Sequence, residues 1–193
     1  MRIIRGFLYT GFLACANGAV GAAAIAVALT SAVASAGTVE PGLLTGSMQK
    51  LILEAPKALP DVALVDMADQ TVSLSAYKGK WLVLNMWATW CAPCREEMPA
   101  LDRLAAEMPG MAVVAVATGP NPLPAIKGFL DKAGVRTLTV LRDPVQELSH
   151  QMGVMGLPVT VIINPEGQEV ARLIGGADWA SPEARAVFAA LAQ

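Results

Sequence analysis

The feature that most constrains this chain is a pair of cysteines, separated by two residues, between a buried strand and a helix. Residues 81–86 form a continuous apolar run, which is typical of a strand buried on both faces, and apolar side chains recur at helical spacing over residues 92–108. Cys91 therefore falls at the helix start, where unpaired N–H groups and the positive end of the helix dipole favour a thiolate. Cys94 lies one turn further along the same helical face.

This spacing predicts a redox site, because a disulfide that closes so short a loop constrains the unfolded chain little. We expect the Cys91 thiolate to attack a substrate disulfide and Cys94 to resolve the mixed disulfide that forms. Pro93 suits the first helical turn, where its missing N–H costs nothing. A metal site needs about four ligands, and besides the two cysteines this part of the chain offers only His150. We therefore expect no cofactor beyond the redox-active disulfide.

Strand and helix signals alternate along the rest of the chain and predict an α/β domain with a mixed sheet over residues 59–193. Strands are expected at 62–67, 71–74, 81–86, 111–117, 138–141, 159–164 and 169–174, and helices at 92–108, 125–133, 143–153 and after Ser181-Pro182. The first two strands and the last two are expected to form hairpins. Residues 37–58 are broken by several Pro and Gly and are predicted to be a linker, with at most a short helix over 48–54.

The N-terminus predicts export. Residues 6–39 carry no charged side chain, whereas Arg2 and Arg5 precede them. Since basic residues stay on the cytoplasmic side, residues 1–36 are expected to act as a signal-anchor in the bacterial inner membrane, with the domain in the periplasm. Cleavage after Ala34-Ser35-Ala36, which would leave the domain soluble in the periplasm, ranks second.

Three further features of the sequence concern the third cysteine, the charge pattern and phosphate binding. A lipoprotein site at Cys15 ranks third among the N-terminal alternatives, and a buried hydrophobic role for this cysteine is the simplest explanation. The net charge is −2 and no two Lys or Arg residues are adjacent, so the sequence lacks the basic footprint that nucleic-acid binding needs. No glycine-rich phosphate loop is present, which argues against nucleotide binding.

The segment Trp-Ala-Thr-Trp-Cys-Ala-Pro-Cys-Arg-Glu-Glu-Met-Pro, residues 87–99, resembles the active-site segment of the TlpA/ResA branch of thioredoxin-like proteins. Residues 77–80, 156–158 and 175–181 extend the resemblance, which covers the chain from about residue 59 to its end. It implies a thioredoxin-like fold: a mixed sheet flanked by helices, with an N-terminal β-hairpin and a central strand-helix insertion. We expect the protein to be a monomer.

The resemblance also implies the substrate-binding residues. Pro158 is expected in cis, against the two sulfurs, because only proline makes a cis peptide bond cheap. Leu157 would offer backbone hydrogen bonds to an extended substrate segment. Ala92 and Pro93 would complete this contact surface, and Trp90 either belongs to it or serves plain packing.

A departure from cytosolic thioredoxins concerns the proton relay. Those proteins carry a buried Asp six residues before the first Cys, where this chain has Asn85, and an Asn cannot accept the proton. Glu97 stands where the TlpA/ResA branch carries a Glu near the site, and it is therefore the candidate relay. The alternative is that Glu97 is a surface acid that complements the helix N-terminus, which is the role expected of Glu96.

The resemblance implies a periplasmic reductase of protein disulfides. The expected substrates are copper-delivery proteins or copper-binding oxidase subunits in cytochrome oxidase assembly, and apocytochrome c before haem attachment is the alternative. A DsbD/CcdA-type membrane carrier would supply the electrons. An alternative of another class is a copper-binding chaperone module, although Sco-type modules are expected to use Cys-x-x-x-Cys plus a distant His.

Overall fold

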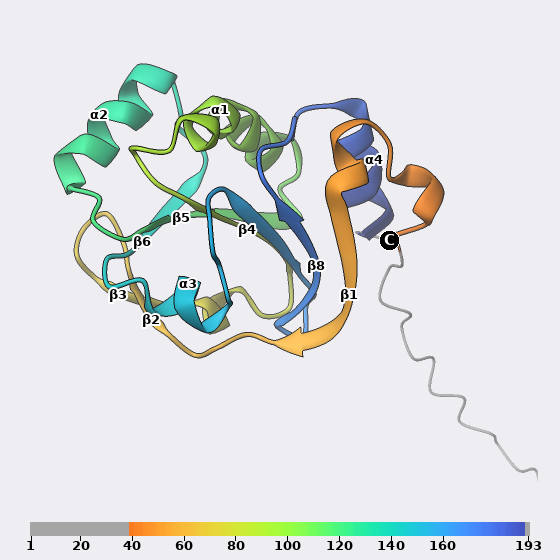
Figure 1. The fold of residues 1–193 in the computed structure, drawn as a ribbon, viewed down its shortest axis with the longest axis horizontal. Helices are drawn as coiled ribbons and strands as arrows, with labels where there is room; N and C mark the ends of the chain where they lie inside the picture. The colour runs from red at the N-terminus through yellow and green to blue at the C-terminus, as the bar shows by residue number, and fades with distance from the viewer. Residues whose placement is uncertain (1–38, 192–193) are drawn as a thin grey trace, which may run out of the picture. The chain divides into compact units, whose positions relative to one another are not determined.

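A mixed sheet of eight strands forms the centre of the domain in the computed structural model, which describes residues 39–191 (Figure 1). The predicted export segment, residues 1–36, lies outside the described residues. The strands are β1 (Leu51–Ala58), β2 (Ala63–Val65), β3 (Thr71–Ser73), β4 (Trp81–Trp87), β5 (Met111–Thr118), β6 (Thr139–Asp143), β7 (Val159–Ile163) and β8 (Gln168–Ile174). Their order is β1-β8-β7-β4-β5-β6-β2-β3, with β4, β5 and β6 parallel and the other neighbours antiparallel.

Helices cover both faces of this sheet (Figure 1). The helices α1 (Ala92–Glu107), α2 (Leu123–Ala133) and α4 (Pro182–Leu191) bury apolar side chains in one core, and α3 (Glu147–Gln151) and the 3-10 turn η3 (Leu74–Tyr77) bury theirs in the other. The β2-β3 pair is the predicted N-terminal hairpin. The elements α2 and β6 lie between β5 and α3 as the expected central insertion. The α/β class with a mixed sheet is confirmed.

Strand β4 explains why its sequence is a continuous apolar run. It lies between β5 and β7, and its alternate side chains enter the two cores. Leu82, Leu84 and Met86 face the α3 side, whereas Val83 and Trp87 face α1. A strand covered on both faces needs apolar residues at every position. The polar residue in its middle, Asn85, is nevertheless fully buried.

The prediction that residues 37–58 form a linker is wrong for the described part, residues 39–58. After the 3-10 turns η1 (Pro41–Leu43) and η2 (Gly46–Lys50), strand β1 pairs antiparallel with β8, with Leu51 opposite Leu173. A helix over 48–54 is therefore also wrong. The sequence pattern hides this strand because Leu51 is its only buried residue. Pro56 fits because β1 is at the sheet edge and its register shifts between Leu53 and Lys57.

We predict that Met48→Ala, in η2, destabilises the domain. Met48 is fully buried in the core that contains α4. Loss of its side chain leaves a cavity and should lower the free energy of unfolding by about 2–5 kcal/mol. Urea denaturation measures this change, and the exposed neighbour Gln49→Ala should stay within about 0.5 kcal/mol of the parent. Equal curves for both variants would mean that these residues behave as a linker after all.

Candidate active site

The two cysteines occupy the position that the sequence predicts, between β4 and α1, and they form a disulfide. Cys91 is the N-cap of α1 with an extended backbone, and its Sγ accepts a hydrogen bond of 3.3 Å from the backbone N–H of Cys94. Pro93 lies in the first turn of the helix. Cys91 is 6 % exposed and Cys94 is fully buried, so only the first of the two cysteines is in contact with solvent. The N–H donor at its sulfur is the contact that stabilises a thiolate.

The peptide bond between Leu157 and Pro158 is cis, as the resemblance implies. It immediately precedes β7, and β7 runs antiparallel to β4 with Val159 opposite Met86. The cis bond therefore lies beside the end of β4 from which the Cys91 loop departs. The Pro158 carbonyl accepts a hydrogen bond of 2.9 Å from the N–H of Gly175, which ties this loop to the segment after β8.

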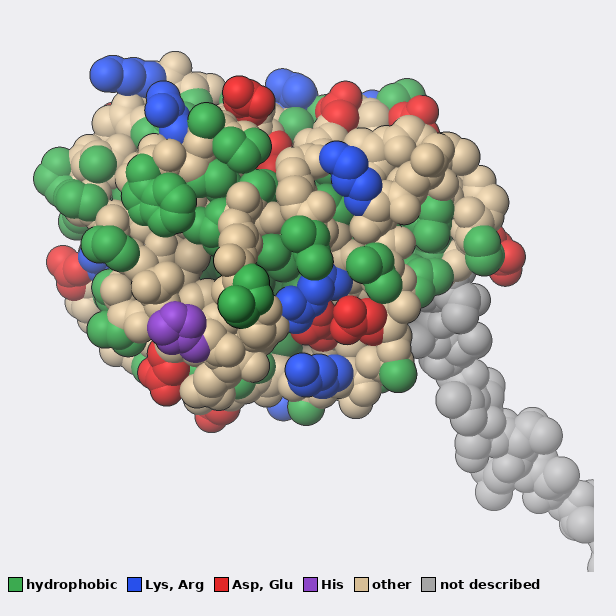
Figure 2. All heavy atoms as spheres, viewed as in Figure 1, with side chains coloured by type: hydrophobic (Ala, Val, Ile, Leu, Met, Phe, Trp, Pro, Cys, Tyr) green, Lys and Arg blue, Asp and Glu red, His purple; other side chains and the backbone are tan. Residues whose placement is uncertain are grey.

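Exposed apolar side chains occur close to the disulfide in sequence and along these loops. Trp90 is 65 % exposed and Met155, two residues before Leu157, is 97 % exposed. Ala92 and Pro93 are also exposed. Hydrophobic side chains gather on the face seen in Figure 2, over the region of α1 and α2 and across the middle of the domain. An indole this exposed adds little to the core, which favours a contact surface over plain packing for Trp90.

Sequence reasoning missed the residue that holds the loop before Cys91. The Oδ1 of Asn121 accepts hydrogen bonds from the N–H and the hydroxyl of Thr89, at 2.7 and 2.8 Å. Its amide donates to the carbonyl of Thr118 at 2.8 Å. The sequence did indicate a turn here, because Asn121 lies between two prolines after β5. In turns, a short polar side chain commonly forms hydrogen bonds to the nearby backbone.

Glu97 is buried one turn after Cys94 and is bound by donors from distant parts of the chain. Its Oε1 accepts from the Asn85 amide at 2.8 Å. Its Oε2 accepts from the backbone N–H of Ala177 at 3.0 Å and from the indole N–H of Trp179 at 2.9 Å. The side chain is 4 % exposed, so the alternative of a surface acid is wrong. Glu96, by contrast, is exposed.

Burial raises the pKa of Glu97, and this effect outweighs the hydrogen bonds from Ala177, Trp179 and Asn85, which lower it. A carboxyl group in such surroundings can take up a proton at a pH where an exposed one stays charged. The Asn85 amide also donates to the Thr160 hydroxyl at 2.8 Å, while its buried Oδ1 has no partner among the described residues. Trp179 and Thr160 were not predicted; the resemblance contained Trp179, but no pattern linked it to Glu97.

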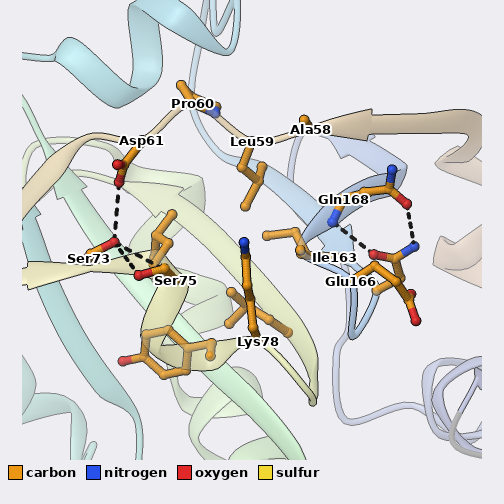
Figure 3. A pocket seen from close by; sticks show the side chains of 15 residues that line it. Ala58, Leu59, Pro60, Asp61, Ser73, Ser75, Lys78, Ile163, Glu166 and Gln168 are labelled. Carbon is orange, nitrogen blue, oxygen red and sulfur yellow. Dashed lines mark hydrogen bonds between the residues drawn. The ribbon is translucent and has the colours of Figure 1, made fainter.

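Other parts of the described domain bear less on this chemistry. A separate cavity of about 320 Å³ lies at the end of β4 opposite the disulfide, where Leu82 lines it. The Lys78 side chain extends into this cavity between Leu59 and Ile163 (Figure 3). Within residues 39–191, no three His, Cys, Asp or Glu side chains are grouped so that they could hold a metal ion. No helix of this part of the chain is long and apolar enough to cross a membrane.

The fold and the helix-start disulfide define a class, the thiol-disulfide oxidoreductases, because a cysteine pair in this position exchanges disulfides. Comparison with known proteins supports the same class. A family model described as the AhpC/TSA family matches residues 56–171. The chain is 32 % identical to the thiol-disulfide oxidoreductase ResA of Geobacillus kaustophilus over 130 residues. This alignment covers 66 % of this chain and 73 % of that protein. Over 125 residues it is 30 % identical to ResA of Bacillus thuringiensis, covering 64 % and 71 %.

The solved structures support the same class. The thiol:disulfide interchange protein DsbE from Chlorobium tepidum is similar with a TM-score of 0.65 and 26 % identity, over 74 % of this chain and 100 % of that chain. The chain therefore belongs to the AhpC/TSA family and, within it, to the TlpA/ResA type of thioredoxin-like proteins. It is an enzyme, a protein-disulfide reductase of the thiol:disulfide oxidoreductase class.

We predict that the stability of the oxidised protein depends on pH through Glu97. In the unfolded chain the pKa of this carboxyl group is about 4.5, and in the folded protein burial raises it. Between these two values the folded state binds more protons, so the free energy of unfolding falls as pH rises. Glu97→Gln lacks this loss of stability. Its free energy of unfolding relative to the parent should therefore increase with pH across that window and then level off. The total increase should be about 1.4 kcal/mol for each tenfold difference in proton affinity between the folded and unfolded states.

Urea denaturation of the disulfide form at a series of pH values measures this difference, because the cysteines do not titrate there. The Gln side chain can be accommodated if the Asn85 amide turns over and presents its unpartnered Oδ1. Glu96→Gln, one position away and exposed, controls for the loss of one negative charge. A constant stability difference between Glu97→Gln and the parent at every pH would refute a raised pKa.

Proposed function

We propose that the protein reduces disulfides of exported proteins, with Cys91 as nucleophile and Cys94 as resolving cysteine. The observation that carries this proposal is the N-cap position of Cys91, whose sulfur accepts the N–H of Cys94. The Cys91 thiolate attacks one sulfur of the substrate disulfide, and the other substrate sulfur leaves as a thiolate. Cys94 then gives up its proton and attacks the Cys91 sulfur. The substrate leaves as a dithiol, and the enzyme holds the disulfide seen in the structure.

Glu97 is the proposed proton acceptor for the second step. Its carboxylate is buried one helical turn after Cys94, and burial raises its pKa toward that of a thiol. Trp90, Ala92, Pro93, Leu157 and Pro158 are proposed to contact the substrate. Exposure of Trp90, Ala92 and Pro93, and the cis bond beside the end of β4, support this assignment.

The proposed substrates are copper-delivery proteins or oxidase subunits in cytochrome oxidase assembly, supported by the segments at 77–80, 156–158 and 175–181 that resemble the TlpA/ResA branch. A DsbD/CcdA-type carrier would regenerate the dithiol. The charge-free segment after Arg2 and Arg5 supports a periplasmic domain anchored in the inner membrane by residues 1–36. Apocytochrome c is the comparison substrate for the test that follows.

We predict that Cys94→Ser accumulates a mixed disulfide and that Cys91→Ser does not. Without Cys94 the covalent intermediate has no internal thiol to resolve it, whereas without Cys91 the intermediate cannot form efficiently. Purified oxidised copper-delivery protein and oxidised apocytochrome c are each incubated with the reduced variants, and adducts are counted on non-reducing gels. Preferential trapping of the copper-delivery protein supports the proposed substrate class. Preferential trapping of apocytochrome c would replace it, and equal trapping by both Cys variants would refute the assigned roles.

We predict that Glu97→Gln slows the resolving step by about 10-fold or more, since loss of a general base commonly costs about 10²–10⁴-fold and water can substitute in part. The initial attack by Cys91 should change less, because the proposed relay acts on the proton of Cys94. Stopped-flow measurements on a fluorescent disulfide substrate separate the two steps between about pH 6 and pH 8. Glu96→Gln is the matched control. If Glu97→Gln resolves as fast as Glu96→Gln over this range, water or another group takes the proton.

A further inference from the structure

The turn η2, which the sequence pattern hides within a supposed linker, lies against the segment that binds Glu97. Lys50 Nζ donates a hydrogen bond of 3.0 Å to the carbonyl of Gly176. Ser47 Oγ accepts the backbone N–H of Asp178 at 3.2 Å. Two residues of η2 therefore hold both ends of the short segment Gly176–Asp178, which follows β8.

The other side of the same segment faces Glu97. The N–H of Ala177 donates to Glu97 Oε2 at 3.0 Å. Gly176 also lies next to this oxygen: a Cβ added there would be 3.8 Å from it, at ordinary van der Waals distance. The segment is thus held between η2 on one side and the buried carboxylate on the other.

One peptide group joins the two contacts. The Gly176 carbonyl, which accepts from Lys50, and the Ala177 N–H, which donates to Glu97, belong to the same peptide unit. The dipole of this unit therefore points its negative end at the ammonium group and its positive end at the carboxylate. Hydrogen bonds in such a chain polarise and strengthen each other. Lys50 can thereby favour the charged form of a carboxyl group that it does not touch.

We propose that Lys50 is a positioning residue of the redox site, which holds the Gly176–Ala177 peptide against the Glu97 carboxylate and adds a positive charge on that side. This inference rests on the proposed role of Glu97 as proton acceptor. Burial and Lys50 act in opposite directions on the pKa of Glu97: burial raises it and the charge of Lys50 lowers it. Lys50 thus limits how strongly the carboxyl group holds its proton.

Three other charged residues line the hollow beside Glu97: Glu96 and Arg103 of α1, and Asp178. On the side of β4 and β7 the neighbours are the neutral Asn85 and Thr160. Lys50 is the cation that bonds to the segment in contact with Glu97, so the experiment varies this residue and keeps the others.

The test follows the indole N–H of Trp179, which donates to Glu97 Oε2 and so reports its titration. The full-length oxidised protein is labelled with ¹⁵N at tryptophan, the Trp179 signal is assigned with Trp179→Phe, and its chemical shift is recorded against pH. We expect the midpoint to move to higher pH in Lys50→Met and to stay near the parent value in Lys50→Arg, which keeps a charge and a donor. Ser47→Ala, which loosens the segment but keeps the charge, should give a smaller shift in the same direction.

Lys57→Met is the matched control, because Lys57 is an exposed lysine of the neighbouring strand β1 with no part in the contacts above. An unchanged midpoint in Lys50→Met, or an equal shift in Lys57→Met, overturns the proposal. Its failure is distinguishable from that of the proposed function. If Glu97→Gln slows resolution but Lys50→Met leaves the midpoint unchanged, only the positioning role fails. If Lys50→Met moves the midpoint but Glu97→Gln resolves normally, only the relay role fails.

Discussion

The site depends on how the buried carboxylate of Glu97 is stabilised. Removing a charged carboxyl group from water costs several kcal/mol unless hydrogen bonds replace the lost hydration. Here the donors are the Asn85 amide from β4, and the Ala177 N–H and the Trp179 indole from the C-terminal segment, 80 and 82 positions after Glu97. These donors fix the places of β4 and of the C-terminal segment relative to α1. The same contacts that keep the carboxylate in the core therefore bring the C-terminal segment beside the first turn of α1, where Gly176 lies next to Pro93.

Strand β4 supplies the second constraint. Its two neighbours, β5 and β7, fix its end, and α1 begins only a few residues later with Cys91 as N-cap. The position of Cys91 follows from where the strand ends, and the position of the cis bond before β7 follows from the register between β7 and β4. The positions of the nucleophile and of the cis bond thus both depend on where one strand ends.

Much of this arrangement could be predicted from residues close together in sequence. The helix-start cysteines, the two hairpins and the cis Pro158 each have a local pattern or a resemblance that indicates them. Strand β1 could not be predicted, because an edge strand with one buried residue has neither alternation nor a continuous apolar run. The partners of Glu97 could not be predicted either: Trp179 is 82 positions away in sequence, and only the folded chain brings them into contact. The same holds for Lys50, which reaches Gly176 across the interface between η2 and the segment after β8.

The hydrogen bonds of Asn121 separate two tasks of the enzyme. Asn121 precedes α2 and holds Thr89, next to the exposed Trp90, whereas the buried carboxylate is bound by residues of β4 and of the C-terminal segment. The loop that carries Trp90 is therefore held by the turn before α2, and the buried carboxylate by β4 and the C-terminal segment. A change at Asn121 would thus release the loop before Cys91 while every hydrogen bond of the buried carboxylate stays in place.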